Sequence, residues 1–457
     1  MSIIIFLLAT SILLIEGWLI AALILSPRER LLCTAFALPI AALSNALLMA
    51  LFTLISISLT AISLLIIHAI LIGVLGFFTM KRKHTHLETH IMHPSHDKIS
   101  RWKLLLFIPS ILIIFSTSIY SFSHAVLLPT FQFDSLTNWT MRSQISFYDQ
   151  KIAFDDTEAR GMAKPQYPFL FHGLQLAINQ GQSVWNDRIA NTITWLLSVS
   201  TFAALWLLIR RNRGKFVATV AIASLFSIPL FSLHTAQGYA DIVLAQYFLL
   251  ALATIAMAID DHQSSSKKYW LILSALFVSA SVWTKSEGFF YGLFPWLIVI
   301  AGLLTTKIIE RKTAIISSVF ALLLSATWPM FALLKQLRLT PHSSDTVFGF
   351  HPEALRELWP ALFGRGSFGI SFFVSIAAIL LLSINRKSMN DRKKVLLLLL
   401  WGIILFAAIL FTYLFTPNAR YLMNAEAFYR QMMMVPALWI VASGFLIKND
   451  HKANYEC

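Results

Sequence analysis

The chain has 457 residues, of which 57% are hydrophobic and only 13% are charged, and its formal net charge is +14. Soluble globular domains carry about a quarter charged residues, so this composition excludes a soluble protein. Apolar runs of membrane-spanning length recur along the whole sequence, which excludes a single anchor. With only two cysteines, Cys33 and Cys457, the chain cannot build a disulfide framework or a four-cysteine metal site.

The apolar runs predict an all-α integral membrane protein with about thirteen transmembrane helices, because a bilayer core about 30 Å thick needs about 20 apolar helical residues. The first run lacks a preceding basic region and is followed by further runs, so we expect a retained helix and not a signal peptide. The predicted spans are 2–25, 31–53, 55–79, 104–125, 187–209, 216–234, 239–258, 269–285, 287–306, 313–334, 368–384, 395–416 and 431–447.

Lys and Arg are divided unevenly between the predicted loops. If residues 81–103 are cytoplasmic, the loops on that side collect the whole basic excess and the loops on the other side are close to neutral. Basic residues are retained on the cytoplasmic side of short loops, so the loops 126–186 and 335–367 are predicted to lie outside. The basic excess therefore indicates topology and contact with anionic membrane lipids, and not nucleic-acid binding.

The basic segment 81–103 divides the chain into two groups of helices. We expect an accessory three-helix membrane module at 1–80, a cytoplasmic linker at 81–103 and a main transmembrane body at 104–450. Histidine-rich tracts can bind metals, although a flexible polar linker explains this one with fewer assumptions. The histidines of the linker are His84, His86, His90, His93 and His96.

The two outside loops are long enough to be functional. One ends in Tyr167-Pro168-Phe169-Leu170-Phe171-His172-Gly173-Leu174-Gln175-Leu176, and the other contains Pro352-Glu353-Ala354-Leu355-Arg356-Glu357-Leu358-Trp359. Each segment places proline near a helix start and apolar residues at helical spacing. We therefore predict helices that lie flat at the membrane interface with their apolar faces toward the lipid.

Short polar motifs occur at the outward ends of the predicted spans. Ionisable groups near membrane depth are costly and usually face a cavity or a partner, although solvated loop charges would give a similar pattern. A carboxylate that faces several cations suits sugar transfer from a lipid phosphate, because a general base deprotonates the acceptor hydroxyl while the cations stabilise the departing phosphate. The candidate site residues are Asp134, Trp139, Arg142, Tyr167, Tyr239, Asp241, Lys285, Glu287, Arg420 and Arg430.

The order of these motifs resembles bacterial members of the GT-C superfamily of polytopic glycosyltransferases, most of all the protein mannosyltransferase-like and aminoarabinose transferase-like group. The resemblance covers roughly residues 130–436. It depends on Asp134-x4-Trp139-x2-Arg142, Tyr167-Pro168, Gly238-Tyr239-Ala240-Asp241, Lys285-x-Glu287-Gly288 and Tyr429-Arg430 before Pro436.

The resemblance implies that Asp134 is the catalytic carboxylate and that the other candidates contact substrates. It implies a polyprenyl-phosphate sugar donor, a glycan, lipid or protein acceptor, and inverting transfer at the outer face of the cytoplasmic membrane. Relatives often carry Lys at the place of Arg142, and their catalytic loop usually follows the first helix and not the fourth. A divalent metal is possible, and Asp155, Asp156 and Glu158 form either its site or a solvated acidic turn.

The sequence is also compatible with another function and with structural roles for some of these residues. A transporter or flippase of a lipid-linked or small anionic substrate is the alternative, although it should place ionisable residues near mid-membrane. Glu16 is expected to have a structural partner in the bundle, or else to handle lipid or protons. Trp139, Trp283 and Trp328 are predicted to belong to an aromatic belt at the lipid interface.

The predicted topology can be tested with single cysteines and a membrane-impermeant thiol reagent in intact cells. We expect cysteines in the 126–186 loop to be labelled and cysteines in 84–96 to react only after the membrane is opened. Labelling of 84–96 from outside would reverse the assignment of sides.

Overall fold

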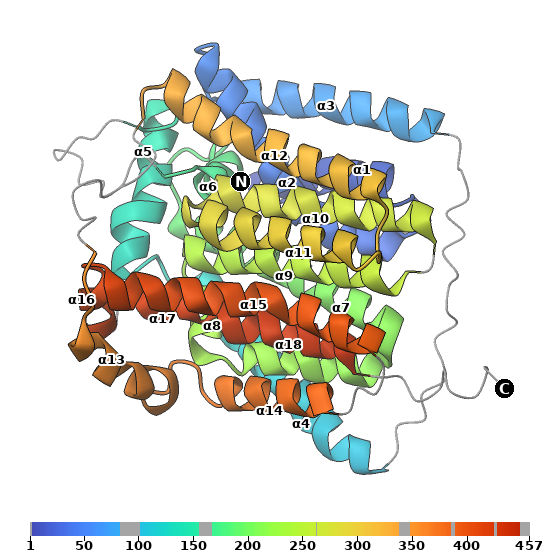
Figure 1. The fold of residues 1–457 in the computed structure, drawn as a ribbon. Helices are drawn as coiled ribbons and strands as arrows, with labels where there is room; N and C mark the ends of the chain where they lie inside the picture. Colours follow the sequence, from blue (N-terminus) through green and yellow to red (C-terminus); the bar gives the residue numbers. More distant parts are fainter. Residues whose placement is uncertain are drawn as a thin grey trace.

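The computed structural model describes residues 2–82, 101–154, 167–261, 263–337, 348–384, 389–424 and 427–447. In these residues every regular element is helical, and nine helices are long and apolar enough to cross a membrane. Figure 1 shows the long helices running roughly side by side. The predicted all-α membrane class is confirmed. All thirteen predicted spans fall on helices, while the number of crossings stays a prediction.

The elements follow one another in this order: α1 (Ser2–Ile24), α2 (Arg30–Leu54), α3 (Ala61–Lys81), α4 (Arg101–Leu127), η1 (Ser135–Thr140), α5 (Met141–Asp149), α6 (Leu170–Asn179), α7 (Asp187–Phe226), α8 (Pro229–His234), α9 (Ala240–Asp260), α10 (Ser264–Thr284), η3 (Gly288–Leu293), α11 (Phe294–Thr305), α12 (Arg311–Leu334), α13 (Pro352–Trp359), η4 (Pro360–Gly364), α14 (Ser371–Ile384), α15 (Met389–Phe415), α16 (Ala419–Met423), α17 (Ala427–Met432) and α18 (Met434–Leu446). The elements η1, η3 and η4 are π-helical turns. The predicted sites at His84–His96 and at Asp155, Asp156 and Glu158 lie outside the described residues.

Helix α7 joins two of the predicted spans, 187–209 and 216–234. The helix is kinked at Gly214, whose φ of 85° is accessible mainly to glycine. The second of these spans continues past the end of α7 into α8, which Pro229 begins. The sequence therefore predicts the right apolar segments, and the glycine sets the kink between them.

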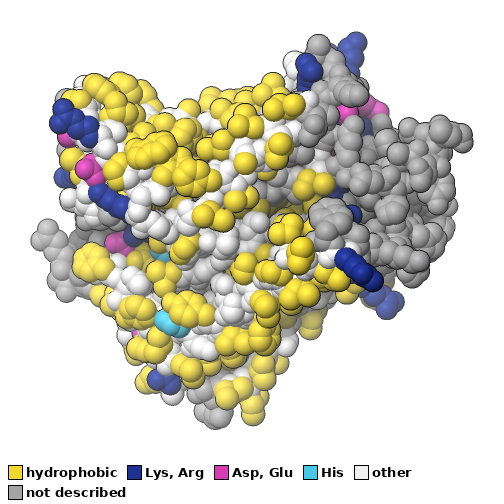
Figure 2. Space-filling model, turned by 90° about the horizontal axis from the view of Figure 1, so that it is seen from below, with side chains coloured by type: hydrophobic (Ala, Val, Ile, Leu, Met, Phe, Trp, Pro, Cys, Tyr) yellow, Lys and Arg dark blue, Asp and Glu magenta, His cyan; other side chains and the backbone are white. Residues whose placement is uncertain are grey.

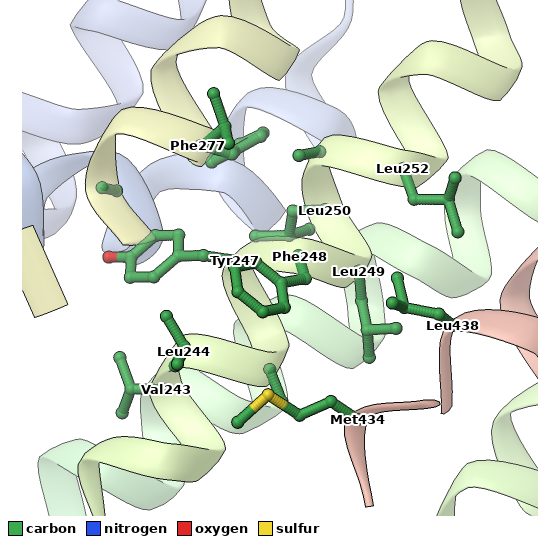
Figure 3. Close-up of a cluster of buried hydrophobic side chains, with 14 of the residues drawn as sticks. Val243, Leu244, Tyr247, Phe248, Leu249, Leu250, Leu252, Phe277, Met434 and Leu438 are labelled. Atoms are coloured by element: carbon green, nitrogen blue, oxygen red, sulfur yellow. The ribbon is translucent and has the colours of Figure 1, made fainter. Parts of the chain in front are cut away.

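Helix α9 is the centre of the bundle, and its side chains from Ala240 to Ile259 are buried. It is apolar on all sides, as expected for a helix surrounded by other helices. It packs against α7, α10 and α18. Figure 3 shows part of this core, where Tyr247 and Phe248 of α9 lie among Phe277 of α10 and Met434 and Leu438 of α18.

The outer helices expose apolar side chains that a soluble protein would bury. Ile62 of α3 is 71% exposed and Leu105 of α4 is 75% exposed. Figure 2 shows one face of the molecule, on which hydrophobic side chains are widespread and many Lys and Arg side chains lie near its edges. Apolar surface of this extent is stable where lipid tails cover it.

Of the N-terminal helices, α2 packs on α1 and also on α6, α7 and α10, and α1 contacts α6 and α10 as well. Helices α1 and α3 are joined by a buried pair, in which Nδ1 of His68 lies 2.5 Å from a carboxylate oxygen of Glu16. Glu16 thus has the structural partner that we expected. The division into an accessory module at 1–80 and a body at 104–450 stays a prediction.

Both predicted outside loops contribute helices to one end of the bundle, which we call the loop end and which carries α5, α6, α13 and α16 (Figure 1). The predicted helices form, as α6 and α13. The expectation that α6 lies flat on the lipid is wrong, because all of its residues except Ala177 are buried. Its apolar side chains pack on α2, α5 and α7 instead. In α13, Leu355 and Trp359 are exposed, so an interfacial position remains a prediction.

The aromatic-belt interpretation of three tryptophans is also wrong. Trp139, Trp283 and Trp328 are each at most 3% exposed, so they face protein and not lipid. Trp283 and Trp328 pack edge to face at 5.6 Å, and Nε1 of Trp283 donates to Thr327. A buried indole needs such a hydrogen-bond acceptor, which explains the orientation of Trp283.

Two helical glycines give a matched test of packing in the N-terminal helices. A Cβ at Gly17 of α1 would lie 1.8 Å from the carbonyl oxygen of Ala37 in α2, whereas a Cβ at Gly76 of α3 would meet nothing within 4 Å. We expect Gly17→Ala to lower the thermal unfolding temperature in detergent and Gly76→Ala to leave it unchanged or raise it, since Ala favours helix over Gly by about 1 kcal/mol. Equal effects of the two substitutions would contradict this packing.

Candidate active site

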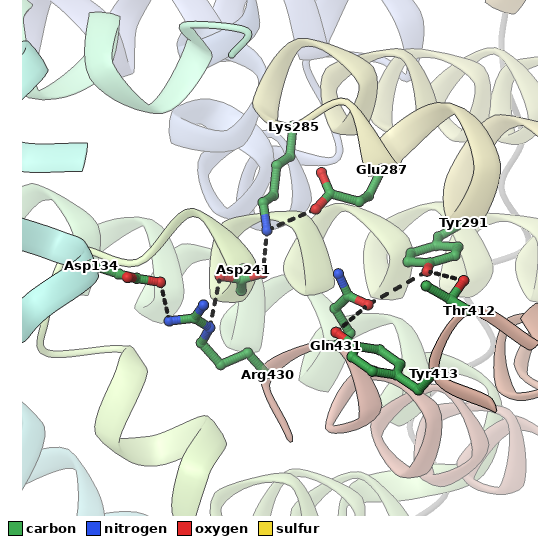
Figure 4. A network of polar contacts seen from close by, with 9 residues as sticks. All are labelled: Asp134, Asp241, Lys285, Glu287, Tyr291, Thr412, Tyr413, Arg430 and Gln431. Atoms are coloured by element: carbon green, nitrogen blue, oxygen red, sulfur yellow. Dashed lines mark hydrogen bonds and ion pairs between the residues drawn. The ribbon is translucent and has the colours of Figure 1, made fainter. Parts of the chain in front are cut away.

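A buried ion pair forms the centre of the candidate site. Asp241 lies in the first turn of α9 and is 1% exposed, and Lys285 follows the last residue of α10 and is 6% exposed. Nζ of Lys285 donates to Oδ1 of Asp241 at 2.8 Å (Figure 4). A charge buried this deeply requires a partner, so each residue holds the other in place.

A second cation extends the cluster toward Asp134. Nη1 of Arg430 pairs with Oδ2 of Asp134, and its Nε lies 3.6 Å from Oδ2 of Asp241. Arg430 comes from α17 and Asp134 immediately precedes η1, so residues almost 300 positions apart meet here (Figure 4). Burial alone would lower the pKa of Arg430, but the carboxylates of Asp241 and Asp134 outweigh it and raise this pKa above its ordinary value.

Glu287 completes the row of charges. One of its oxygens lies 3.1 Å from Nζ of Lys285, and the other oxygen, Oε2, is buried without a hydrogen-bond partner among the described residues. We call Asp134, Asp241, Lys285, Glu287 and Arg430 the charge cluster. It contains three carboxylates and two cations, and each cation is paired with two of the carboxylates.

Two glycines allow the backbone to approach closely enough to form the cluster. Gly238 has a φ of +45°, and a Cβ there would lie 2.9 Å from Oγ of Ser135, whose hydroxyl donates to the Gly238 carbonyl at 3.1 Å. A Cβ at Gly288 would lie 2.3 Å from the carbonyl oxygen of Ser281 in α10. The first contact brings η1 onto the start of α9, and the second folds η3 back on α10. These approaches explain the glycines in the Gly-Tyr-Ala-Asp and Lys-x-Glu-Gly motifs.

Irregular helical turns flank the carboxylates of the charge cluster. Asp134 directly precedes η1 and Glu287 directly precedes η3. A π-helical turn inserts an additional residue into a helix and redirects the side chains beside it, and such turns are frequent at functional sites. The side chains of Asp134 and Glu287 are 26% and 23% exposed, whereas that of Asp241 is 2% exposed. The carboxylates beside the π-helical turns are therefore the accessible ones.

Aromatic rings surround the cations of the cluster. Nζ of Lys285 lies 5.7 Å from the centre of the Trp139 ring and 5.8 Å from that of Tyr167. The guanidinium of Arg430 lies 5.3 Å from the ring centre of Tyr239. Such faces stabilise a cation while excluding water, so they support charges in a partly dry site.

Arg142 has a structural role, contrary to the substrate contact that its motif suggested. It is 1% exposed, its Nε donates to the carbonyl of Ala153 at 3.0 Å, and its Nη1 donates to the carbonyl of Tyr167 at 2.5 Å. Desolvation lowers the pKa of Arg142 to about 9. This environment offers no surface to a ligand, so we assign Arg142 to joining the two segments on either side of residues 155–166.

Arg420 is not placed in the charge cluster either. It is exposed on α16, and its guanidinium donates to the hydroxyl of Tyr421 at 3.0 Å. Of the ten candidates from the sequence, eight lie together in the cluster or in its aromatic walls, and Arg142 and Arg420 are the exceptions.

A group of uncharged polar residues beside the cluster was not predicted. Oε1 of Gln431 accepts from the hydroxyl of Tyr413 at 3.2 Å and lies 3.5 Å from the hydroxyl of Tyr291, which in turn lies 3.4 Å from Thr412 (Figure 4). Gln431 directly follows Arg430, which is the one signal that could have indicated it. Tyr291, Thr412 and Tyr413 lie in apolar runs without a distinguishing motif.

The sequence also did not predict a role for His172 of α6 in the site. Its Nδ1 lies 2.8 Å from the carbonyl oxygen of Trp139, and its ring stacks on the Trp139 ring at 5.4 Å. Desolvation, and to a lesser degree the charge of Arg142, holds the pKa of His172 well below its ordinary value. A neutral His172 therefore orients Trp139, which forms one wall of the site.

Among the described residues, no group of three or more His, Cys, Asp or Glu side chains is arranged to hold a metal ion. In the charge cluster the cations lie between the carboxylates and keep them apart. The described residues therefore provide no binding site for the divalent metal that the sequence allowed.

Comparisons with known proteins support the fold. No protein-family model matches the chain, and no curated protein matches it. The crystal structure of ArnT from Cupriavidus metallidurans in the apo state is similar, with a TM-score of 0.53, 14% sequence identity and coverage of 77% of this chain and 60% of that chain. The same protein bound to undecaprenyl phosphate gives a TM-score of 0.52 and 15% identity over 75% of this chain and 59% of that chain.

ArnT is an aminoarabinose transferase with a GT-C fold, so the predicted resemblance is confirmed at the level of the fold. The matched part of this chain corresponds to about three fifths of the length of ArnT. At such low identity the likeness concerns the arrangement of helices and does not assign an activity.

The buried pair can be tested by a double-mutant cycle. Asp241→Asn leaves less negative charge beside the buried ammonium of Lys285. Removing one partner of a buried ion pair lowers the free energy of unfolding by about 3–5 kcal/mol. We expect Asp241→Asn and Lys285→Met each to lower the unfolding temperature in detergent, and the double variant to lose less than the sum of the two. Additive losses would show that the two residues do not act as a pair.

Proposed function

We propose that this chain is a GT-C-type glycosyltransferase that moves a sugar from a polyprenyl phosphate to an acceptor. The charge cluster carries this proposal, because it places a partly exposed carboxylate beside two cations at one end of an apolar helix bundle. The similar ArnT structure bound to undecaprenyl phosphate supports a polyprenyl-phosphate donor. The positive loops at the opposite end support an active site on the outer face of the cytoplasmic membrane, within the cell envelope.

In this proposal Asp134 is the general base. Its carboxylate accepts the proton of an acceptor hydroxyl while the hydroxyl oxygen attacks the anomeric carbon of the donor sugar. The bond from that carbon to the phosphate oxygen breaks, and the polyprenyl phosphate leaves with the electron pair. Attack opposite the leaving group inverts the configuration at the anomeric carbon. Asp134 suits this role better than Asp241, which is buried and engaged by Lys285 and Arg430.

Lys285 and Arg430 are the cations that would stabilise the departing phosphate. Both are already paired with carboxylates, so a phosphate has to replace a carboxylate as their partner. Arg430 is the better placed to exchange, because its pair with Asp134 is more exposed than the pair of Lys285 with Asp241. Transfer of Arg430 from Asp134 to the phosphate would also free Asp134 to act as a base.

A transporter with this arrangement is less well supported. Transporters place their ionisable residues near mid-membrane, between structural repeats. Here the charge cluster lies at helix ends.

The role of Asp134 predicts the effect of removing its charge. Asp134→Asn keeps the size of the side chain but removes the proton acceptor, so sugar transfer should fall by about 10²–10⁴-fold. The measurement is transfer of radiolabelled sugar from a panel of polyprenyl-phosphate donors to membrane extract. Glu353→Gln, which changes an exposed carboxylate on α13, is the matched control and should transfer at the parent rate. Near-parent transfer by a stably inserted Asp134→Asn protein would assign the base to another carboxylate.

The role of the cations predicts weaker donor binding. Lys285→Met and Arg430→Met each remove a charge-assisted hydrogen bond worth about 1.5–3 kcal/mol, so donor affinity should fall about tenfold or more. Titration of each purified variant with polyprenyl phosphate measures this affinity, and the unfolding temperature shows that the variant is folded. Lys312→Met, at the opposite end of the bundle, is the control. Unchanged affinity in both cluster variants would place the phosphate elsewhere.

A further inference from the structure

Basic residues gather where α4 begins and α7 is kinked, at the end of the bundle opposite the loop end (Figure 1). We call this end the basic end. The segment from Arg210 to Lys215 contains four cations, and α4 carries Arg101 and Lys103 in its first turn. Helix α4 has no acidic residue, and the only acidic residue of α7 is Asp187 at its other end. The two helices therefore bring only positive charge to this place.

Two of the four cations at the kink of α7 are engaged inside the bundle. Nη1 of Arg211 donates to Oε1 of Glu29, which precedes α2, at 2.9 Å. Nη2 of Arg213 donates to Oδ2 of Asp260, the last residue of α9, at 2.6 Å. Nε of Arg213 donates to the carbonyl of Phe445 in α18 at 2.7 Å. These cations have a structural role, because they join α7 to α2, α9 and α18.

The other two cations of the kink, Arg210 and Lys215, are exposed. In the part of the chain that the structure describes, no acidic side chain pairs with either of them. Arg101 at the start of α4 is exposed too, and it also has no carboxylate partner there. These three charges can therefore meet a negatively charged group from outside the protein.

Aromatic rings hold two of the cations at the surface shared by α4 and α7. The guanidinium of Arg210 lies 4.9 Å from the centre of the Trp206 ring, and Nζ of Lys103 lies 5.7 Å from the centre of the Phe216 ring. Phe216 in turn packs on Phe107 of α4, with 6.4 Å between the ring centres. Side chains that are already ordered lose less entropy when a ligand binds, so these contacts favour binding.

Helices α4 and α7 run antiparallel, which places their cations at the same end of one interface. Near the loop end, Phe122 of α4 lies 4.9 Å from Trp195 of α7, measured between ring centres. Near the basic end, Phe107 contacts Phe216 instead. Arg210 precedes Phe216 by less than two helical turns, so it lies near the start of α4. The cations of both helices therefore face the same part of the membrane surface.

Exposed apolar side chains follow these cations along α4. Leu104, Leu105, Leu106 and Ile108 are all exposed. Helix α4 lies at the edge of the bundle farthest from α3 and packs mainly on α7, so its outer face is covered by lipid (Figure 1). An anionic phospholipid matches both parts of this surface, since its phosphate pairs with cations and its acyl chains cover apolar side chains. A soluble anion matches only the cations.

We propose that an anionic phospholipid binds between α4 and α7 at the basic end. Its phosphate lies among Arg101, Lys103, Arg210 and Lys215, and its acyl chains lie along the exposed face of α4. Basic pockets between transmembrane helices bind anionic headgroups in this way. The lipid links α4 to α7 at the end of the bundle opposite the charge cluster. This site does not depend on the proposed function, because no sugar takes part in it.

The test is native mass spectrometry of the purified full chain, titrated in detergent with phosphatidylglycerol, phosphatidylcholine or glycerol 3-phosphate. We expect phosphatidylglycerol to bind most tightly. Arg210→Met/Lys215→Met should weaken the binding of the first phosphatidylglycerol by about tenfold or more, because each cation contributes to the attraction. The matched control Arg311→Met/Lys312→Met removes two exposed charges at the start of α12, also at the basic end, and should bind like the parent. The unfolding temperature shows that each variant is folded.

Four results would overturn the inference. Equal binding of phosphatidylglycerol by the parent and the folded Arg210→Met/Lys215→Met variant would show that these cations are not used. An equal loss in the α12 control would identify a general attraction to the basic end and not a site. Glycerol 3-phosphate bound as tightly as phosphatidylglycerol would identify a site for a soluble phosphate ester, and phosphatidylcholine bound as tightly would exclude recognition of negative charge.

Discussion

The pairing of Asp241 with Lys285 is the constraint on which the rest of the site depends. Both charges are almost fully buried, and an unpaired charge in that position would be too costly to keep. Asp241 lies in the first turn of the central helix α9, and the apolar residues packed around α9 fix the position of this turn along the bundle axis. Lys285, which follows the last residue of α10, must therefore lie at the same position along the axis. Arg430 and Glu287 lie around this pair. The hydrophobic core thus determines where the charges lie, although it contributes no charge itself.

Close backbone contacts place partly exposed carboxylates beside the buried Asp241–Lys285 pair. Gly238 and Gly288 permit approaches that a side chain would block, and the π-helical turns after Asp134 and Glu287 direct those carboxylates toward more accessible positions. The result is a division between one buried carboxylate that holds the cations and two partly exposed carboxylates that are able to meet a substrate. Both cations are paired with carboxylates of the protein, so the proposed donor has to compete with these carboxylates.

The sequence predicts much of this arrangement because membrane helices follow from apolar length, and because motifs at helix ends on one side of a bilayer must share a surface. Asp134, Asp241, Lys285 and Arg430 could be grouped on that basis. The burial of α6 and of Trp283 could not be predicted, because composition does not show whether an apolar face meets lipid or protein. The motif around Arg142 indicated a substrate contact, because no sequence pattern shows that the partners of this side chain are the backbone carbonyls of Ala153 and Tyr167.

The proposed donor phosphate replaces one carboxylate partner at Lys285 and one at Arg430. An experimental structure of the chain with bound polyprenyl phosphate tests this claim most directly. We expect phosphate oxygens within hydrogen-bond distance of both cations, with Arg430 withdrawn from Asp134 and Asp241 still paired with Lys285. A phosphate bound away from these cations, with the Arg430–Asp134 pair intact, would contradict it.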